Sequence, residues 1–327
     1  MIFALLIILI FILALSYYTY YICFHSPAKR KEDPYEKMDG AQYKEVHDNI
    51  YASTRIMDKA KAKQIEITSF DGLTLQARYY HKNDGAPVQI LFHGYRSHPL
   101  RDCAGAYMLA MKMGFNVLAV DQRAHCKSGG RVITFGICER HDCVSWANYV
   151  SSHFPDSPII LGGLSMGAAT VLMASELPLP QNVCAIMADC PYSSPKAIIR
   201  KVCKDRKIPA ALAYSFIWLG ARLFGGFSLE DCSAEEAVRN ATHPILLIHG
   251  EDDLFVPCEM SRRIYKACAS NAQLHTFRQA GHGLCYMTDP LRYEDIVTRF
   301  LWDIPALKPH MEKSTYVQKE LRGEIKY

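Results

Sequence analysis

The segment 158–169 constrains the fold of this chain more than any other part of its sequence. An apolar run is followed by Gly-Gly-Leu-Ser-Met-Gly, in which the serine is Ser165, and then directly by two helix-forming alanines. A buried strand, a Gly-x-Ser-x-Gly turn and a helix in this order predict a serine on a tight turn, with its hydroxyl above the edge of a sheet. Glycines on both sides relieve the crowding of such a turn. The pattern predicts a nucleophile at Ser165 and not a phosphate-binding loop, which would end in Lys-Ser or Lys-Thr.

Around this segment, short apolar runs alternate with longer helical stretches, which is typical of a mostly parallel sheet wrapped by helices. The pair Asp71-Gly72 indicates a hairpin turn between the first two strands. We expect helices over Asp102–Met113, Arg140–Ser152, Ala168–Glu176, Met260–Ala269 and Arg292–Trp302. We expect eight strands, over Gln64–Ser69, Leu73–Tyr80, Val88–Phe92, Asn116–Val120, Pro158–Leu161, Val183–Ala188, Ile245–Ile248 and Gln273–Phe277.

An acid and a histidine follow two later strands of this set. The strand Ile245–Ile248 is followed by His-Gly-Glu-Asp-Asp, which ends at Asp253, and His282 stands between two glycines after the last strand. Side chains that follow parallel strands gather at the carboxyl edge of an open α/β sheet. There the acid can accept the Nδ1–H of the histidine, and the histidine can take the proton of the serine. The chain order serine, acid, histidine predicts Ser165, Asp253 and His282 as one catalytic triad.

Two backbone N–H groups are expected to complete this site. The strand Val88–Phe92 ends in His-Gly-Tyr, which leaves the N–H of Tyr95 at the carboxyl edge of the sheet. The N–H of Met166 follows the serine directly. Paired donors of this kind stabilise the tetrahedral intermediate of acyl transfer, so Tyr95 and Met166 are the predicted oxyanion hole.

With these motifs the chain resembles the α/β-hydrolase superfamily, and within it the bacterial esterase and lipase-like hydrolases of the serine aminopeptidase S33 type. The resemblance extends from about Gln64 to Trp302. It implies an α/β-hydrolase fold, with nucleophile, acid and base at the three triad positions named above. Asp252 is the first alternative for the acid, and Asp189, after the strand Val183–Ala188, is a more distant one.

One loop departs from the family pattern. The usual Arg-Gly-His-Gly-x-Ser sequence after the fourth strand reads Arg-Ala-His-Cys-Lys-Ser over residues 123–128, so both glycines are replaced. We expect a changed backbone path in this loop and no loss of activity, because it lies outside the triad.

An insertion over about 191–240 separates two strands of the predicted sheet. Its stretch Ile208–Phe227 is strongly apolar and contains Phe216, Trp218 and Phe224. Such a segment is either a helical cap over the site or a core helix, and its place after a strand end favours a cap. An apolar cap would favour acyl or aromatic esters.

The segment Ile2–Phe24 holds 23 uncharged residues, enough for a helix across a hydrocarbon core of about 30 Å. Its tyrosines at positions 17, 18, 20 and 21 would lie at the lipid–water boundary. The basic run Lys29–Lys31 follows, so the positive-inside rule predicts a cytoplasmic catalytic domain. The alternative is a signal peptide cleaved after Ala14-Leu15-Ser16, although this segment has no basic n-region.

Composition adds limits on compartment and partners. A net charge of +4 is too small and too dispersed for a nucleic-acid-binding protein. The 12 cysteines form no Cys-x-x-Cys pair, and one of them lies in the apolar segment, which suits a reducing compartment better than a disulfide scaffold. The local group Cys138, His141 and Cys143 has no fourth ligand at a familiar spacing, so we expect no metal site.

Together these features divide the chain into a membrane anchor (1–24), a polar, partly helical tether (25–62), an α/β-hydrolase domain (63–304) and a polar tail (305–327). We expect a serine hydrolase that cleaves small-molecule carboxylic esters through an acyl-enzyme, without a metal or organic cofactor. A peptidase or acyltransferase would use the same triad. A membrane-tethered ligand-binding module without catalysis is the alternative of another class, and it would be expected to lack a triad member.

Overall fold

The computed structural model describes residues 1–27, 33–38 and 40–325, and the predicted basic run Lys29–Lys31 lies outside this part. Its centre is an eight-stranded sheet in the order β1-β2-β4-β3-β5-β6-β7-β8. β2 runs antiparallel to both β1 and β4, and the other neighbouring strands are parallel, which confirms the predicted fold class. The strands are β1 Lys63–Thr68, β2 Thr74–Tyr80, β3 Val88–Phe92, β4 Asn116–Asp121, β5 Ile159–Leu164, β6 Val183–Asp189, β7 Ile245–Gly250 and β8 Ala272–Phe277.

The largest difference from the predicted strand boundaries lies at β5. The sequence placed the end of this strand at Leu161, because a glycine pair usually signals a turn. In the structure Gly162 and Gly163 remain extended and pair with Met187 and Ala188 of β6, so that β5 continues to Leu164. The strand therefore carries the chain directly to Ser165.

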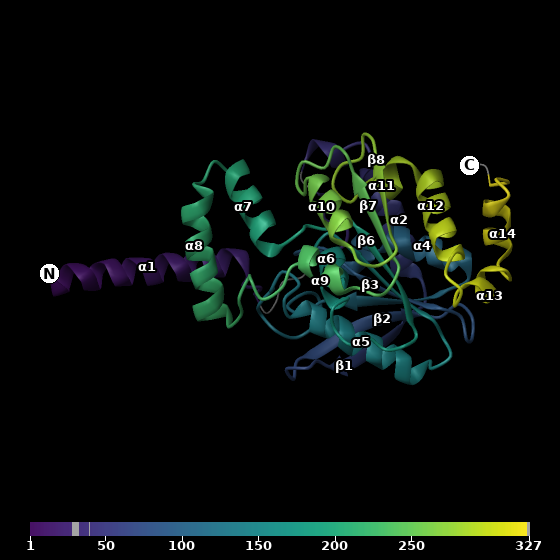
Figure 1. Cartoon of the computed structure of the whole chain (residues 1–327), viewed down its shortest axis with the longest axis horizontal. Coiled ribbons are helices and arrows are strands. Elements are labelled where there is room, and N and C mark those ends of the chain that lie inside the picture. Colours follow the sequence, from purple (N-terminus) through teal and green to yellow (C-terminus); the bar gives the residue numbers. More distant parts are fainter. Residues whose placement is uncertain (28–32, 39, 326–327) are drawn as a thin grey trace.

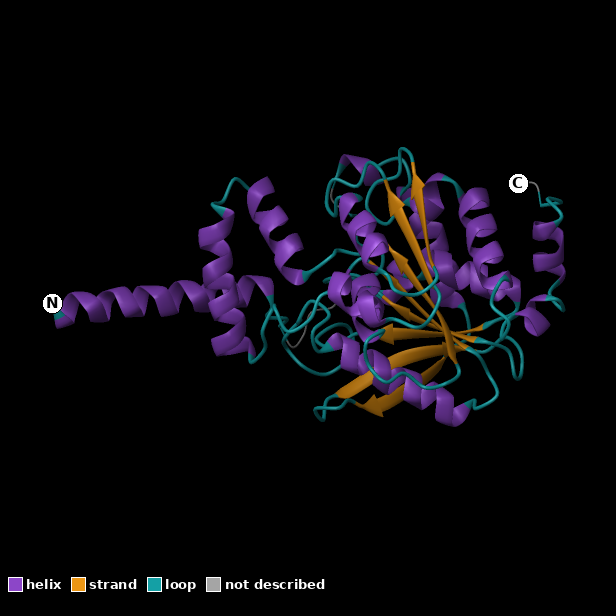
Figure 2. Ribbon diagram, in the orientation of Figure 1, coloured by secondary structure: helices purple, strands orange, loops and turns teal. Residues whose placement is uncertain are grey.

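Helices cover both faces of the sheet (Figures 1 and 2). α5, α6, α9 and α10 contribute buried side chains to one hydrophobic core, and α2, α4, α12 and α14 contribute to the core on the opposite face. The helices are α1 Ile2–Cys23, η1 Ala41–Tyr43, α2 His47–Lys59, α3 Pro99–Asp102, α4 Ala104–Met113, α5 Glu139–His153, α6 Met166–Ala174, α7 Pro195–Asp205, α8 Ala210–Gly220, η2 Ala221–Gly225, α9 Ala234–Ala237, η3 Val238–Asn240, α10 Glu259–Ala267, α11 Cys285–Thr288, α12 Pro290–Trp302, α13 Lys308–Met311 and α14 Thr315–Leu321.

One predicted helix and the predicted polar tail have more internal structure than the sequence indicated. The helix expected over Asp102–Met113 is divided at Cys103 into α3 and α4, and His98 caps the first of them by accepting the N–H of Leu100. The polar tail forms α13 and α14, whose Met311 and Val317 are fully buried in the core beside α12. The tail thus packs on the surface of the domain.

The segment predicted as a tether packs against the domain as well. Ile50 and Met57 of α2 are buried, and α2 contacts α3 and α4. The chain just after α1 is also fixed, since Ser26 donates its N–H to Arg131 O at 2.8 Å and Phe24 O accepts the N–H of Ile133 at 2.8 Å. Phe24 itself is fully buried. The end of α1 therefore has a defined position on the domain.

α1 itself extends away from the domain (Figure 1). Most of its side chains from Met1 to Leu13 are exposed and apolar. Among the described residues, α1 is the helix that is long and apolar enough to cross a membrane, a property that signal sequences share. Its last turns contact α8 of the insertion, which runs across α1 rather than along it.

Candidate active site

Ser165 occupies the turn between β5 and α6. Its backbone has φ +57° and ψ −111°, a conformation that costs a residue with a Cβ roughly 1–3 kcal/mol. The turn depends on two glycines: a Cβ on Gly163 would overlap the backbone of Gly167, and a Cβ on Gly167 would overlap the carbonyl of Phe92. The close approach of β3, β5 and α6 therefore allows only hydrogen at these positions, and it holds the Ser165 hydroxyl at the edge of the sheet.

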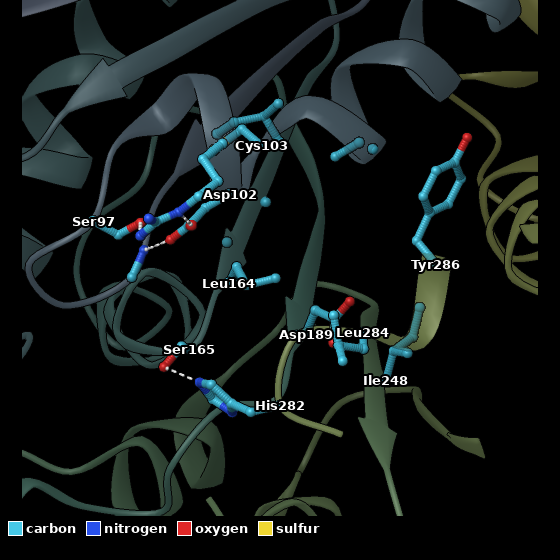
Figure 3. Close-up of a pocket in the computed structure, with 18 of the residues that line it drawn as sticks. Ser97, Asp102, Cys103, Leu164, Ser165, Asp189, Ile248, His282, Leu284 and Tyr286 are labelled. Carbon is cyan, nitrogen blue, oxygen red and sulfur yellow. Dashed lines mark hydrogen bonds and ion pairs between the residues drawn. The ribbon is translucent and has the colours of Figure 1, made fainter. Parts of the chain in front are cut away.

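Hydrogen bonds connect Ser165 to two residues that lie far away in the sequence. His282 Nε2 lies 3.0 Å from Ser165 Oγ (Figure 3). His282 Nδ1 lies 2.7 Å from Asp253 Oδ2. Because Asp253 accepts the Nδ1 proton, Nε2 is left free to accept the proton of the serine hydroxyl. The structure thus brings together the three residues predicted as a triad, in the predicted order of contacts.

Asp253 is held in place by hydrogen bonds from its own loop and from a second histidine. The backbone N–H groups of Phe255 and Val256 donate to its Oδ1 at 2.9 and 2.8 Å. The fully buried His249 places its Nε2 3.3 Å from Asp253 Oδ2 and 2.8 Å from Val256 O. Since a carbonyl only accepts, this Nε2 carries the proton, and Nδ1 accepts from the hydroxyl of Ser261 at 2.6 Å.

Burial alone would raise the pKa of the Asp253 carboxyl, but its hydrogen bonds to His249 and His282 outweigh burial and hold this pKa well below its usual value. Asp253 is therefore ionised at neutral pH, as a residue that orients the histidine must be. The supporting role of His249 was missed in the sequence. The only signal there was its place just before Gly250, in a motif that mirrors the His93-Gly94 pair after β3.

The two alternative acids have other positions. Asp252 is exposed, and its backbone N–H donates to Ala280 O. Asp189 is buried and lines the cavity, but its side-chain Oδ1 has no hydrogen-bond partner among the described residues. Burial raises the pKa of Asp189 to about 6, against the partial opposing effects of His249, His282 and Tyr293. Asp189 contacts the site through its backbone, since Asp189 O accepts the N–H of Ser165 at 2.8 Å.

The loop after β3 approaches Ser165 from the other side. An added Cβ on Gly94 would lie 3.6 Å from Ser165 Cβ, and Gly94 donates its N–H to Asp102 Oδ2 at 2.8 Å. Met166 begins α6, and the first N–H groups of a helix have no acceptor within it. The N–H of Gly94 is thus used by Asp102, so Tyr95 remains the residue of this loop whose N–H, with that of Met166, is predicted to bind an oxyanion.

This loop also contacts the end of α1. The hydroxyl of Tyr95 donates to Cys23 O at 2.8 Å, and the guanidinium of Arg96 donates to Ile22 O at 2.6 Å. These carbonyls belong to the last turn of α1, where no intrahelical donor remains for them. The predicted oxyanion loop and the apolar helix are therefore joined directly.

A cavity of about 340 Å³ opens beside Ser165 and His282. Its wall is largely apolar (Figure 3), with Asp102, Asp189 and Arg101 among its polar members. The residues 191–240 contribute no side chain to this lining; the cap function of that insertion stays a prediction. The apolar lining residues include Met38, Ile50, Leu91, Phe92, Leu164, Met187, Ile248, Leu284 and Met287.

The segment before β1 contributes to this wall instead. Gln42 Oε1 accepts the backbone N–H of His282 at 3.2 Å, and the hydroxyl of Tyr43 donates to His282 O at 3.2 Å. Both residues line the cavity. They lie about 240 positions before His282 in the sequence, and no sequence pattern connects them to it. These two contacts fix both backbone polar groups of the predicted base.

Within the described residues, one group of potential metal ligands lies close together: Cys190, Asp253 and His282, with ligand atoms within 4.8 Å of one another. Burial, followed by the charges of Asp189 and Asp253, raises the pKa of the Cys190 thiol well above its usual range. A thiol that stays protonated is a poor ligand, and the Asp253–His282 hydrogen bond already uses two of the three groups. The donor set therefore fits a hydrogen-bonded triad better than a metal site.

The loop that departs from the family pattern keeps a left-handed backbone. Ala124 has φ +61° and Cys126 has φ +47°, at the two positions where the family has glycine. Arg123 fixes the loop through ion pairs with Asp142 at 2.6 Å and Asp71 at 2.9 Å. A left-handed backbone costs Ala124 and Cys126 about 1–2 kcal/mol each, because both carry a Cβ.

Comparison with known proteins shows which enzymes this chain is similar to. The family model described as "Serine aminopeptidase, S33" matches residues 86–223, and the model described as "Serine hydrolase (FSH1)" matches residues 221–284. An esterase of Pyrococcus furiosus superimposes with a TM-score of 0.61 and 27% sequence identity, over 76% of this chain and 92% of its own. The chain is a serine hydrolase with the α/β-hydrolase fold.

Several curated relatives are similar to this serine hydrolase. The uncharacterized protein YqkD of Bacillus subtilis (strain 168) is 23% identical over 81% of this chain and 88% of its own length. Human protein ABHD12B is 26% identical over 56% of this chain, and the lysophosphatidylserine lipase ABHD12 of Macaca fascicularis is 22% identical over 53%. The chain spans 50% and 42% of these two relatives, about half of their length.

Proposed function

We propose that this enzyme hydrolyses carboxylic esters of apolar acyl groups, with Ser165 as nucleophile, His282 as general base and Asp253 as the acid that orients it. The observation that supports this most is the continuous hydrogen-bond chain from Asp253 through His282 to Ser165, which ends at an apolar cavity. The largely apolar wall of this cavity offers contacts to an acyl chain or an aromatic ring.

The reaction would proceed in two steps. Ser165 Oγ attacks the ester carbonyl carbon while His282 Nε2 takes its proton, and the carbonyl electron pair moves onto the oxygen. The N–H groups of Tyr95 and Met166 stabilise this oxyanion. The tetrahedral intermediate collapses, the alcohol leaves with the proton from His282, and the acyl group remains on Ser165. Water then attacks the acyl carbon, gives a proton to His282, and the carboxylic acid is released from a regenerated serine.

A substrate with one acyl chain fits the shape of this site. The cavity volume of about 340 Å³ is at the lower end for small-molecule pockets. The relatives include a lysophosphatidylserine lipase, an enzyme named for a lipid with a single acyl chain. Single-chain lipid esters are thus the first substrates to test, with aromatic esters as the second class.

α1 is proposed as the membrane anchor of this enzyme, with the catalytic domain on the cytoplasmic side. The 22 residues of α1 are long and apolar enough for a span, and the basic run Lys29–Lys31 follows it in the sequence. All 12 cysteines are free, which agrees with a reducing compartment. Protease treatment of sealed membrane vesicles tests this orientation, because a cytoplasmic domain is degraded in inside-out vesicles only.

The catalytic proposal is tested with the full chain in detergent and a fluorophosphonate probe. We expect labelling of the wild type and none of Ser165→Ala, followed by hydrolysis of p-nitrophenyl esters that depends on chain length. A Ser175→Ala variant, which changes another buried serine, is the matched control and should label normally. A folded wild-type chain that is not labelled would contradict the proposed nucleophile. Equal turnover of esters and of the matching anilides would favour the peptidase.

A further inference from the structure

The insertion between β6 and β7 carries an apolar surface that continues from α1. Leu212 of α8 and Leu223 of η2 are 60% and 52% exposed, and Ile208 and Phe224 are also exposed. α8 contains no charged residue. A group of large exposed apolar side chains on one element is unusual for a protein surface in water and marks a contact site.

α8 packs on α1 in the manner of two helices in a membrane. A Cβ on Gly220 would overlap Ser16 O and lie 3.1 Å from Tyr20 Cβ, so the two backbones are in close contact. Thr19 Oγ1 donates to Phe216 O at 3.1 Å across this contact. Small residues at the contact and a hydroxyl-to-backbone hydrogen bond are characteristic of helix pairs in lipid.

The contact also sets the depth of α8 relative to a bilayer that α1 would span. The ring of Phe224, in the insertion, contacts two tyrosines of α1: its centroid lies 5.2 Å from that of Tyr17 and 6.0 Å from that of Tyr20. Tyrosines of a spanning helix lie at the lipid–water interface. The 22 residues of α1 are about 33 Å long, close to the hydrocarbon thickness of about 30 Å, so its last turns lie near one edge of the core. α8, which crosses α1 at this level, lies at the same depth (Figure 1).

Basic side chains surround the junction of α7 and α8. Arg200, Lys201, Lys204 and Lys207 line a shallow concavity together with Ile208, Pro209 and Ala210. Lys201 pairs with Asp205 at 2.6 Å, and Arg200 lies over the Tyr214 ring. Lys204 and Lys207 are exposed. Basic residues beside an apolar interfacial helix match the phosphates of anionic lipids in charge and position.

We propose that α8 and η2 are a second membrane-contacting element, which lies in the interface beside α1, and that Lys204 and Lys207 bind the phosphates of anionic phospholipids. The insertion would then hold the catalytic domain in one orientation on the bilayer. This inference rests on the proposed anchor role of α1.

The test uses the full chain in vesicles, and Trp218 of α8 as the reporter. Trp218 is half-buried, with its Nε1 buried, and it lies on the helix face of the exposed Ala211 and Ser215. Trp146, in contrast, is fully buried in the core. Lipids with brominated acyl chains quench only tryptophans that reach the acyl region. We expect quenching in the wild type that disappears in Trp218→Phe, with unchanged hydrolysis of a soluble ester by both proteins.

A second comparison tests the lipid phosphates. Brominated phosphatidylserine should quench Trp218 more strongly than brominated phosphatidylcholine at low salt. Lys204→Gln/Lys207→Gln should weaken this preference by roughly fivefold per lysine removed. Lys313→Gln/Lys319→Gln, which changes two exposed lysines of the C-terminal segment, should leave it unchanged.

The outcomes separate the two proposals. Vesicle flotation after a high-salt wash shows whether α1 anchors the chain, and a chain that does not float overturns the anchor and this inference together. A chain that floats without Trp218 quenching leaves the anchor in place and overturns the inference. Absence of quenching together with a dimer in nanodiscs would assign the apolar surface to a second copy and would also overturn it. Equal quenching by the two lipids overturns the phosphate contact.

Discussion

The two buried aspartates near Ser165 should respond to the same substitution in opposite directions. Burial raises the pKa of Asp253, but its hydrogen bonds to His249 and His282 outweigh burial and hold this pKa well below the usual value. Burial raises the pKa of Asp189 from its usual 3.8 to about 6, and one of its oxygens has no partner. The first carboxylate stabilises the folded state at neutral pH, and the second destabilises it.

The stability cost of the ionised Asp189 follows from the difference between its pKa in the folded and in the unfolded state. A shift of about two pKa units in a buried group corresponds to about 3 kcal/mol. The folded-state pKa is raised, so this cost is fully present above pH 6, falls as the pH drops from about 6 to 3.8, and is absent below that range. Asp189→Asn should therefore raise the melting temperature at pH 8, by roughly 2–4 °C per kcal/mol, and should lose this advantage near pH 4.

Asp253→Asn should change the stability of the folded state in the opposite direction. A carboxylate with a lowered folded-state pKa contributes stability above its unfolded-state pKa, and this contribution is lost as the pH falls. At pH 7 the variant should be less stable by roughly 2–3 kcal/mol, the value of hydrogen bonds to a charged group. Its kcat for a p-nitrophenyl ester should fall by roughly 10³–10⁴-fold, because an amide leaves the histidine in the wrong tautomer.

The assays are thermal unfolding from pH 4 to 8 and ester hydrolysis at pH 8, on both variants and the wild type. Asp189→Asn is expected to remain active. If Asp189→Asn lost activity as completely as Asp253→Asn while it stayed folded, the assignment of the acid would be wrong. If it were less stable than the wild type at pH 8, the argument from a buried carboxylate with one unpartnered oxygen would fail.

Three further substitutions test other contacts of the site. Gln42→Ala removes the acceptor of the His282 N–H and should lower kcat by roughly tenfold at unchanged melting temperature, with rescue by Gln42→Glu, which keeps an acceptor oxygen. Gly167→Ala places a methyl group against the carbonyl of Phe92, so that melting temperature and probe labelling should both fall. Arg123→Met leaves the buried Asp142 unpaired and should cost roughly 3–5 kcal/mol of stability in denaturant unfolding, whereas a smaller loss would show that solvent reaches this loop.

The sequence predicted the parts of the site that depend on local pattern. Ser165 was recognisable because strand, glycine-flanked serine and helix follow one another without a gap, and the crowding at Gly163 shows why this string is required. Asp253 and His282 were predicted since parallel strands place their carboxyl ends at one edge. The division at Cys103 and the extension of β5 were not predicted, because both depend on what the backbone meets in the neighbouring layer.

Contacts across long sequence distances were outside the reach of these patterns. Gln42 and Tyr43 lie in a polar stretch with no strong periodicity, and their contact with His282 depends on how this stretch folds back onto the domain. The sequence showed His249 as part of a motif, but the position of its ring beside Asp253 depends on hydrogen bonds with Ser261 and Val256. The apolar insertion was predicted to cover the cavity, and its side chains contact α1.

These contacts give the segment before β1 a part in the geometry of the reaction. Carbonyls at the end of α1 accept hydrogen bonds from the side chains of Tyr95, the predicted oxyanion donor, and of Arg96 beside it. Gln42 and Tyr43 hold the backbone of His282. The nucleophile is fixed by the turn after β5, but the oxyanion loop and the base each have partners before residue 44. A displacement of α1 or of the following segment would therefore move two of the three reacting groups relative to Ser165. Since a misplacement of about 1 Å can cost 10²-fold in rate, the position of the helix on the domain bears directly on catalysis.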